Sequence, residues 1–396
     1  SDLSFVVLDG LESLLNKNLL YSAEGRTGET RFFMLETIHE YARERLAQCG
    51  EVDDFKTRHA VYFASLAERA EIELHGPGQE YWYARLTDEL DNVRTVLDWV
   101  FDGANLELGA RLVAALREFW YWKGLLSESS AWIDRALQCE WSTSPTVMAK
   151  TLNAASRIAY ARGNHAEGEL VARQALSQAR DINDKENRAW AHLFLGSHLM
   201  FFDDRLTEAI AHVEESLRLF RELDLKAGTV NGLNMLGELA RLDGDYRRAG
   251  QLYEECLTVA KEMGDIQIEA KILGNLSYVA FHQGSFGRAI DYCTKASNLI
   301  SHLQLEYANA IALAMIAGPV GAQGKPELAA RLLAASAAQL EAMGATVQPA
   351  DKLEVDRYRN SVRRQLGEME FNKAWAEGRA MSFEDAIALA LGNDMD

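Results

Sequence analysis

Proline and cysteine are scarce in this sequence of 396 residues, and long apolar runs are missing altogether. Five prolines among many alanine, leucine, glutamate and arginine residues favour helix almost throughout. No apolar run is long enough to indicate a membrane span. The cysteines form no CxxC pair and no secretory signal is present, so we expect reduced thiols and a cytoplasmic chain. The four cysteines are Cys49, Cys139, Cys256 and Cys293.

Basic residues are outnumbered by acidic ones. The sequence has 41 lysines and arginines against 59 aspartates and glutamates, a formal net charge of −18 at pH 7. Because binding to a DNA duplex needs clustered basic side chains, we expect no direct nucleic-acid contact from this chain. Its length exceeds that of one compact core, which predicts several domains or an elongated array. The start, Ser1–Phe5, lacks a methionine, and we interpret the chain as a fragment of a longer protein.

The common catalytic motifs are missing too. A phosphate-binding loop needs GxxxxGK followed by serine or threonine, and the nearest stretch, Gly318–Pro326, is one residue too long and ends in proline. No HExxH, nucleophile elbow or DxDxDG loop occurs, and the nine histidines are scattered. We therefore expect no enzyme activity, no catalytic residue, no metal and no cofactor in this chain. The minor alternative is an enzyme with an unfamiliar pocket, whose turnover would be lost on changing Arg157 or Glu238.

What the sequence does contain is a repeat, because four series of residues recur every 40 residues. The leucine series is Leu193, Leu233, Leu273 and Leu313, and the alanine series is Ala209, Ala249, Ala289 and Ala329. The small-residue series is Ser197, Gly237, Ser277 and Ala317, and the turn series is Asp204, Gly244, Gly284 and Gly324. A further copy lies 41 residues upstream, at Leu152, Ser156, Gly163 and Gly168. Such a period is typical of repeat arrays, which usually bind other molecules.

Each repeat predicts two helices joined by a short turn. The apolar run Val230–Leu242 ends shortly before Gly244, which can adopt the left-handed conformation that closes a helix. Asp245 is then placed to cap the next helix, which starts at Tyr246. The periodic serine, glycine and alanine residues let the paired helices approach closely, so we interpret them as a packing signature.

The residues of one repeat resemble the tetratricopeptide consensus in the order Leu236-Gly237, Ala240, Gly244, Tyr246, Ala249, Tyr253. Five clear copies cover about residues 149–348, and a weaker sixth lies around Val113–Ala136 with Gly124 at its turn. We therefore predict an all-α superhelix of helical hairpins over residues 106–348. A period of 40 implies longer helices than the usual 34, a variant that resembles the sensor arms of bacterial signal-transduction ATPases. The alternative is an ordinary helical bundle with accidental periodicity.

Residues 1–50 do not follow the 40-residue repeat. The amphipathic run Leu8–Lys17 is followed by two β-prone stretches, Leu19–Tyr21 and Arg31–Met34, and then by the helical run Leu35–Ala47. Helix, two-stranded wing and helix are what a winged-helix unit needs. The sequence therefore predicts a small winged-helix domain before the repeats.

The runs Leu8–Leu20 and Arg31–Ala42 resemble the winged-helix domain of STAND-type (NB-ARC-like) ATPases. In that family a Met-His-Asp motif places a histidine near the phosphate of bound ADP. The matching positions here are Met34, Leu35 and Glu36, which the resemblance places against the nucleotide domain. Leucine replaces the histidine, so direct phosphate sensing through this position is not expected. We interpret His39, one helical turn later, as an ordinary helix residue; the alternative is a substitute ligand for the phosphate.

The resemblance continues on both sides of the repeats, through a predicted helical connector at residues 51–105 and a predicted helical cap at residues 349–396. In the connector it rests on Arg58–Phe63, Gly76-Pro77 and Glu89–Trp99. In the cap it rests on Phe371–Ser382 and Glu384–Ile387. Ser382 followed by Asp385 is a capping pattern. The side chains expected to cover the last repeat are Phe383, Ile387 and Leu391.

If the first helix of each repeat lines an inner groove, the repeat register gives the side chains that face it. Amides, an arginine–glutamate combination and aromatic rings suit a polar ligand or an extended peptide. The alternative is that half of these side chains pack between neighbouring helices. The candidates are Tyr121, Trp122, Asn153, Arg157, Tyr160, Phe194, His198, Phe201, Asn231, Asn234, Glu238, Arg241, Tyr278, Phe281 and His282.

Together these features predict the sensor and coupling part of a STAND-type signalling ATPase that regulates transcription. The resemblance implies that ATP or ADP binds a nucleotide domain outside this chain and that an effector domain lies beyond one of its ends. The expected partners are a protein or small-molecule inducer in the groove and the protein's own ATPase domain, with no membrane. Ligand-induced oligomerisation of the whole protein is also expected. The alternative is a tetratricopeptide adaptor that docks a protein without any switch.

Overall fold

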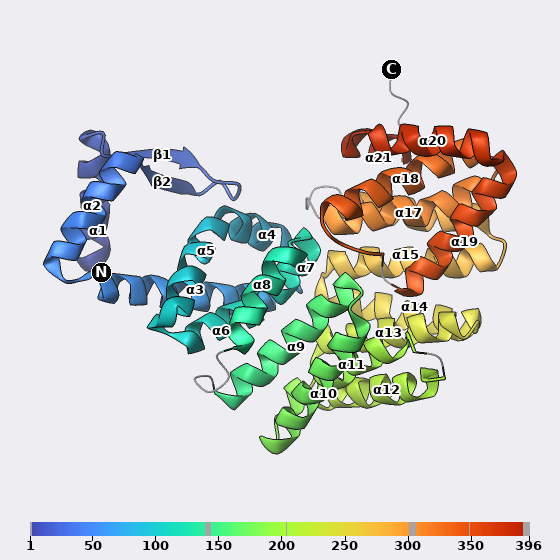
Figure 1. The fold of residues 1–396 in the computed structure, drawn as a ribbon, viewed down its shortest axis with the longest axis horizontal. Helices are drawn as coiled ribbons and strands as arrows, with labels where there is room; N and C mark the ends of the chain where they lie inside the picture. Colours follow the sequence, from blue (N-terminus) through green and yellow to red (C-terminus); the bar gives the residue numbers. More distant parts are fainter. Residues whose placement is uncertain (1, 139–143, 203, 301–305, 348, 391–396) are drawn as a thin grey trace.

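The computed structural model describes residues 2–138, 144–202, 204–300, 306–347 and 349–390 (Figure 1). Helices dominate, and the strands in these ranges form one antiparallel hairpin. The elements before the repeats are α1 (Asp2–Asn16), β1 (Leu20–Glu24), β2 (Thr30–Met34), α2 (Glu36–Cys49), α3 (Val52–Glu73), α4 (Gln79–Asp88), α5 (Leu90–Trp99) and a wide helical turn, Val100–Ala104.

The repeat region consists of paired helices, as the periodicity predicts. Its helices are α6 (Leu106–Ala115), α7 (Arg117–Lys123), α8 (Leu126–Leu137), α9 (Pro145–Arg162), α10 (His165–Asp181), α11 (Lys185–Leu199), α12 (Leu206–Glu222), α13 (Lys226–Leu242), α14 (Tyr246–Met263), α15 (Ile266–His282), α16 (Phe286–Ile300), α17 (Glu306–Ala322) and α18 (Pro326–Ala342). The helices that follow are α19 (Pro349–Leu366), α20 (Glu368–Ala380) and α21 (Phe383–Ala390).

The N-terminal module, residues 2–49, has the predicted order of helix, hairpin and helix. Tyr21 pairs with Phe33 across the hairpin, and their rings stack with centroids 5.3 Å apart. β1 extends to Glu24, beyond the predicted stretch, because the polar end of the strand still pairs with β2. Helix α2 buries no residue. Figure 1 shows that the module projects from one end of the molecule.

The turns between paired helices confirm the role expected of the turn series. All four residues are left-handed, with φ values of 63°, 82°, 72° and 85° for Asp204, Gly244, Gly284 and Gly324. Asp245 Oδ1 accepts a hydrogen bond from the Arg248 N–H at 2.9 Å, so it caps α14 as predicted. The local sequence therefore determines where the chain reverses direction between the two helices of each pair.

Small residues lie where paired helices cross. The alanines of the alanine series are fully buried. A Cβ added at Gly237 in α13 would overlap the ring of the buried Tyr253 in α14. The periodic small residues thus set the spacing of the helix pairs.

The array closes on itself, which the periodicity does not predict. Gln79 Nε2 of α4 donates to Asp265 Oδ1 at the start of α15, at 2.7 Å. The ring of Tyr121 in α7 lies 5.2 Å from that of Tyr307 in α17. One apolar core consequently includes residues of α3 to α9 and of α15 to α18. The concave side of the superhelix is therefore an interior, not an open groove.

The C-terminal helices do two different things. α20 packs on α18, and α21 on α17 and α18, at the far end of the array from the N-terminal module (Figure 1). The Asp385 N–H donates to Ser382 Oγ at 3.1 Å, which confirms the predicted capping pattern. α19 also packs on α17 and α18, but in addition it contacts α13, two repeats earlier. The side chains of Phe383 and Ile387, and all of Leu391, lie outside the described part of the structure.

We expect Gly237→Ala to lower the free energy of unfolding by about 1–3 kcal/mol, because the added methyl group forces α13 away from Tyr253. Gly250→Ala is the matched control, since its Cβ would meet nothing closer than Val279 Cγ1 at 3.6 Å. Alanine is the better helix former, so the control should gain about 0.5–1 kcal/mol. The midpoints of urea unfolding measure both changes, and equal effects would contradict the packing role of Gly237.

Candidate functional site

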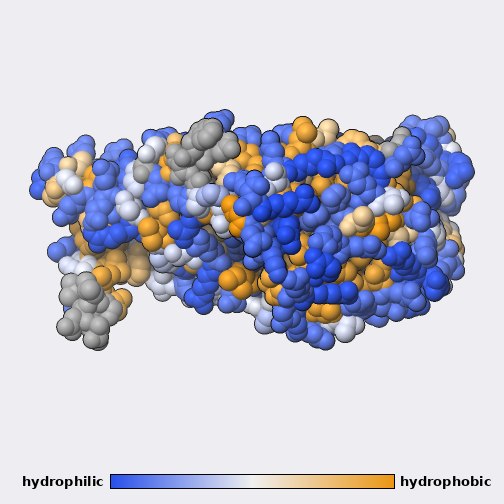
Figure 2. Space-filling view, turned by 90° about the horizontal axis from the view of Figure 1, so that it is seen from below, coloured by the Kyte–Doolittle hydropathy of each residue, from blue (hydrophilic) through white to orange (hydrophobic). Residues whose placement is uncertain are grey.

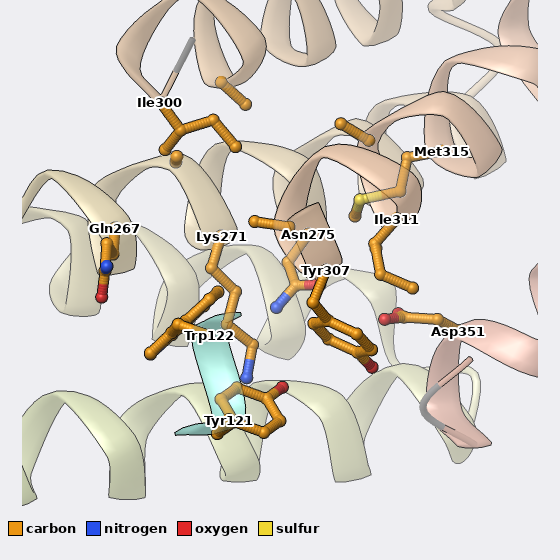
Figure 3. A pocket seen from close by; sticks show the side chains of 14 residues that line it. Tyr121, Trp122, Gln267, Lys271, Asn275, Ile300, Tyr307, Ile311, Met315 and Asp351 are labelled. Atoms are coloured by element: carbon orange, nitrogen blue, oxygen red, sulfur yellow. The ribbon is translucent and has the colours of Figure 1, made fainter. Parts of the chain in front are cut away.

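Six charged side chains from five helices meet inside the closed array, and we call them the central cluster. Its members are Glu118 of α7, Arg157 of α9, Glu238 and Arg241 of α13, Lys271 of α15 and Asp351 of α19. Figure 3 shows Lys271 and Asp351 directed toward the space between Tyr121 and Tyr307. Ion pairs of this kind are costly to bury, so their presence in an interior requires an explanation.

Glu118 and Arg157 form one end of the central cluster. The Arg157 guanidinium lies 3.4 Å from the centroid of the Tyr121 ring, and its Nε is 3.6 Å from Glu118 Oε1. Arg117, beside them, pairs with Glu71 at 2.7 Å. Burial alone would raise the pKa of Glu118, but Arg157 and Arg117 hold that pKa below its usual value. This end is ionised and internally balanced.

Glu238 and Lys271 form the middle of the central cluster. Lys271 Nζ lies 3.4 Å from Glu238 Oε1, which also accepts from Asn234 Nδ2 at 2.7 Å. Asn275 Nδ2 donates in turn to Asn234 Oδ1 at 2.7 Å. Glu238 Oε2 is buried and has no hydrogen-bond partner among the described residues. The chain of hydrogen bonds thus joins α13 to α15 and leaves one buried acceptor unsatisfied.

Arg241 and Asp351 form the other end. Arg241 Nη2 lies 2.9 Å from Asp351 Oδ1, and Arg241 Nη1 lies 3.8 Å from Glu354 Oε1. Glu354 Oε1 is also 2.8 Å from His282 Nε2. Burial raises the pKa of Asp351 to about 6 even though Arg241 lies beside it. The carboxylate form of Asp351 is therefore poorly compensated.

Two small cavities border Lys271. One, of about 60 Å³, lies between α7, α15, α16 and α17, and its walls are mostly apolar side chains such as Ile300 and Met315 (Figure 3). The other, of about 30 Å³, lies between α9, α11 and α13 and includes Arg157 and Tyr160. Tyr160 Oη is buried without a hydrogen-bond partner among the described residues. Spaces of this size hold a few water molecules, so a larger ligand requires the array to open.

The predicted groove residues divide into two groups. Those buried in the structure are Tyr121, Trp122, Asn153, Tyr160, Phe194, His198, Asn234, Glu238, Arg241 and Tyr278. Those partly exposed are Arg157, Phe201, Asn231, Phe281 and His282. The structure brings Tyr121, Arg157, Glu238 and Arg241 together at the central cluster. Asn153, His198 and Phe201 instead pack between neighbouring helices.

His198 shows what this second group does. It is fully buried, its Nε2 lies 3.1 Å from Ser156 Oγ, and a Cβ on Gly168 would overlap its ring. Burial lowers the pKa of His198 to about 3, and the neighbouring His165 adds to the effect. Burial likewise lowers the pKa of His192, on the same helix, to about 4. These histidines are neutral core residues near neutral pH.

Sequence reasoning missed Lys271, Glu118 and Asp351. Lys271 lies 40 residues after Asn231, so the register that selected Asn231 also carries the signal for Lys271. Glu118 precedes the clear repeats. Asp351 lies beyond them, and no periodicity places α19 inside the array.

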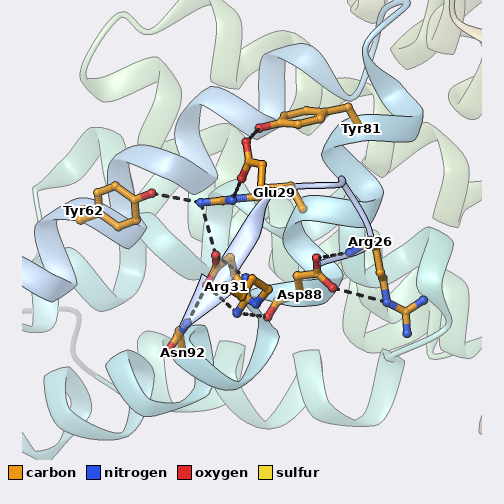
Figure 4. Close-up of polar contacts among 9 residues, drawn as sticks. Arg26, Glu29, Arg31, Tyr62, Tyr81, Asp88 and Asn92 are labelled. Carbon is orange, nitrogen blue, oxygen red and sulfur yellow. Dashed lines mark hydrogen bonds and ion pairs between the residues drawn. The ribbon is translucent and has the colours of Figure 1, made fainter. Parts of the chain in front are cut away.

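The N-terminal module meets the connector through polar contacts that we call the hairpin clamp (Figure 4). Arg31 Nη1 donates to Glu89 Oε1 at 2.8 Å, and Arg31 Nη2 donates to the Asp88 carbonyl at 2.8 Å. Burial alone would raise the pKa of Glu89, but the hydrogen bonds from Arg31 and Asn92 hold it below its usual value. Other clamp contacts are Arg26 with Asp88, and Glu29 with Tyr81 and Arg85.

The positions predicted to face a nucleotide domain lie beyond this clamp. Met34 is partly buried at the end of β2, Leu35 is 55% exposed, and Glu36 is exposed at the start of α2. Within the described ranges, no helix is long and apolar enough to cross a membrane. In the same ranges, no three His, Cys, Asp or Glu side chains are arranged to hold a metal ion.

Comparison with known proteins identifies the repeat. Residues 187–262 match the family description "Tetratricopeptide repeat". Curated proteins from Mycobacterium tuberculosis and Mycobacterium bovis are named as HTH-type transcriptional regulators, a role that their names mark as unproven, and are 27% identical over 342 residues. The match covers 80% of this chain and 38% of each relative, so the chain spans well under half of their length. The chain is a tetratricopeptide-repeat protein distantly related to these regulators.

Solved structures share the fold at low identity. The crystal structure of a Rap protein complexed with Competence and Sporulation Factor has a TM-score of 0.51 and 13% identity, over 73% of this chain and 81% of that one. A signal-transduction ATPase with a tetratricopeptide-repeat sensor, from Pyrococcus horikoshii, has a TM-score of 0.49 and 16% identity, over 97% of this chain and 60% of that one. The first shows a shared arrangement of paired helices, and the second is too distant to support an argument.

We expect acid to destabilise the fold through its buried histidines. The pKa of His198 is lower in the folded chain than in the unfolded one, so its contribution to stability is present above about pH 6.5 and is lost as the pH falls toward 3. The loss approaches about 1.4 kcal/mol per pH unit for each such histidine. Asp351 acts in the opposite sense, because its folded pKa is raised and its contribution is lost as the pH rises through about 6.

Urea unfolding of the His198→Gln variant at pH 7 and pH 5 measures this effect. The variant should lose less stability between the two pH values than the parent chain does. His39→Gln removes an exposed histidine and is the matched control, which should behave like the parent. Identical pH dependence in all three proteins would contradict the buried-histidine explanation.

Proposed function

We propose that this chain is the sensor and coupling part of a STAND-type signalling ATPase that regulates transcription. An inducer or protein partner would bind inside the repeat array, and the connector would pass the change to the N-terminal module. The relation to HTH-type regulators over 80% of the chain supports a regulatory role. The relatives are much longer, which leaves room in them for nucleotide-binding and effector domains.

The observation that carries the proposal is the central cluster. A repeat array is stabilised by the packing of apolar and small residues. Buried ion pairs add little to its stability, because desolvation offsets their attraction. Here charged groups of α7, α9, α13, α15 and α19 converge, and Glu238 Oε2 and Tyr160 Oη are buried without partners among the described residues. Unsatisfied buried groups cost about 1–3 kcal/mol each. A polar ligand that pairs with them would recover this cost on binding.

A physical route for coupling runs through α4. On one side, Gln79 and Tyr83 donate hydrogen bonds to Asp265 and Gln267 of the repeat array, at 2.7 and 3.0 Å. On the other side, the end of α4 and the next residue, Glu89, hold the hairpin clamp. A ligand that moved α15 would therefore act on the module through one short helix, as a shift between two arrangements.

The N-terminal module offers a surface for a further domain. Leu8, Tyr21, Leu35 and Tyr41 are each more than half exposed. Figure 2 shows hydrophilic residues over most of this face, with apolar residues scattered among them, some at the end of the molecule that carries the module. In the proposed whole protein, the nucleotide domain covers this surface. ATP or ADP would bind there and not on this chain.

The second candidate is an adaptor that docks a partner protein without a switch. The Rap protein, which shares the arrangement of helix pairs, was solved with a bound factor, so the fold is compatible with simple docking. The two candidates differ in one respect that can be measured. In an adaptor, a substitution at the central cluster alters amide exchange in the repeats and leaves the N-terminal module unchanged.

We expect Lys271→Met to speed amide exchange in the hairpin by about threefold or more, because losing the Glu238 partner loosens α15 and with it the bond between Gln79 and Asp265. Lys261→Met is the matched control, since it removes a lysine whose side chain is 57% exposed on the neighbouring helix α14. Hydrogen–deuterium exchange with mass spectrometry reports both regions at once.

A response confined to the repeats would favour the adaptor over the sensor. Calorimetric titration of the chain with ATP gives an independent check, and no binding is expected at micromolar nucleotide. Micromolar binding would contradict the proposed division of labour between this chain and a separate nucleotide domain.

A further inference from the structure

Helix α19 contacts the central cluster through Asp351. In a repeat array each unit contacts only its neighbours, so a terminal cap should contact the last repeat alone. α20 and α21 behave in this way, whereas α19 packs on α17 and α18 and also reaches back to α13. Arg241 of α13 and Asp351 of α19 pair although 110 residues separate them. α19 is thus a segment laid across the interior.

The turn before α19 enters the same interior. Thr346 Oγ1 donates to the Ala161 carbonyl at 3.2 Å, and Tyr307 Oη donates to the Thr346 carbonyl at 3.2 Å. Met343 lies against the left-handed Gly124, where a Cβ would come within 2.6 Å of its sulfur. The turn between α7 and α8, which contains Gly124, is therefore in contact with a side chain that follows α18, at the other end of the array.

One face of α19 makes the inward contacts. Asp351 pairs with Arg241, and Glu354 with His282. Val355 and Tyr358, four residues after each of them, are 4% and 1% exposed in the apolar core beside the cluster. The opposite face carries Leu353, which is 58% exposed. This is the pattern of an amphipathic helix seated in a groove.

Charge explains why the inward face of α19, which presents two carboxylates, lies there although the helix as a whole carries more basic than acidic side chains. Without Asp351, the central cluster has three cations, Arg157, Arg241 and Lys271, against two carboxylates, Glu118 and Glu238. His282 adds a further polar partner at the edge. α19 supplies two carboxylates, but the fit is imperfect, because Glu238 Oε2 and the hydroxyl groups of Tyr278 and Tyr358 remain buried without partners among the described residues. A competing ligand can improve on such a fit.

We propose that α19 is a built-in occupant of the groove and that the partner is an amphipathic helix of another protein, with two carboxylates on its inserting face, that displaces it. The partner would present the α19 pattern Asp-x-x-Glu-Val-x-x-Tyr, with two carboxylates one turn apart and apolar side chains four residues after each. Displacement frees Arg241 and His282 for the incoming carboxylates. The inference rests on the proposed sensing role of the interior and names its partner and its regulation.

The test compares Asp351→Asn/Glu354→Gln with Asp356→Asn, which removes an aspartate of α19 whose side chain is 44% exposed. In the double variant, hydrogen exchange of α19 should rise at least tenfold while α9 to α16 stay protected. A labelled peptide with the sequence of residues 349–366 should bind the double variant at least tenfold more tightly than the parent, whose own helix competes. The same peptide with both carboxylates changed to amides should bind at least tenfold more weakly. The Asp356→Asn control should match the parent.

Loss of protection throughout the array would show that α19 is an ordinary structural helix and would overturn the proposal. So would equal binding of the unaltered peptide and its amide form, or preference for a small dicarboxylate such as succinate over the peptide. The unaltered chain gives a second test that does not depend on the variant folding. An excess of the unaltered 349–366 peptide should speed α19 exchange there, and no change would overturn the proposal.

The proposed function fails separately from this inference. If the peptide displaces α19 but hairpin exchange stays constant, the displacement stands and the coupling fails. If Lys271→Met changes hairpin exchange but no peptide binds, the coupling stands and the built-in occupant is wrong.

Discussion

The rest of the structure depends on one buried carboxylate, Asp265. Its Oδ1 caps α15 by accepting from the Ile268 N–H at 3.0 Å, and the same oxygen accepts from Gln79 Nε2 at 2.7 Å. Its Oδ2 lies 3.3 Å from His75 Nδ1. Asp265 thus has two roles. It caps its own helix, as a residue at this position of any repeat could, and it also ties the connector to a repeat nearly 190 residues later. Because of that tie, the superhelix becomes a ring, its concave side becomes an interior, and the charged side chains that line it must satisfy one another.

The sequence predicts those parts of the fold that local chemistry determines. Gly244 closes a helix and Asp245 caps the next because each acts within four residues of itself. The ring closure has no such signal, since Gln79 meets Asp265 only after the repeats have accumulated their curvature. The same limit applies to the site. Register selects Glu238 and Arg241 correctly for the inward face, but it cannot tell that α19 covers them.

Closure also changes how stability is distributed. An open array of repeats is stabilised by nearest-neighbour contacts and can open anywhere along its length. Here α4, α7 and α15 share one core, so opening the ring exposes apolar residues from both ends of the array at once. Buried charges in such a ring bring little net stability, because their desolvation offsets their attraction. They do make the interior favour a ligand whose charged groups can pair with them over a ligand that lacks such groups.

A ligand larger than a few waters requires the ring to open, and two of its seams differ in their polar contacts. At the α4 seam, Asp265 accepts several hydrogen bonds, and the Ile266 N–H also donates to Gln79 Oε1 at 3.1 Å. At the α19 seam, burial raises the pKa of Asp351 to about 6, which marks an ion pair that its surroundings compensate poorly. In the proposed displacement, the α19 seam is the one that the partner opens. The α4 seam joins α15 to the module, so a change of occupant that moves α15 reaches the module through α4.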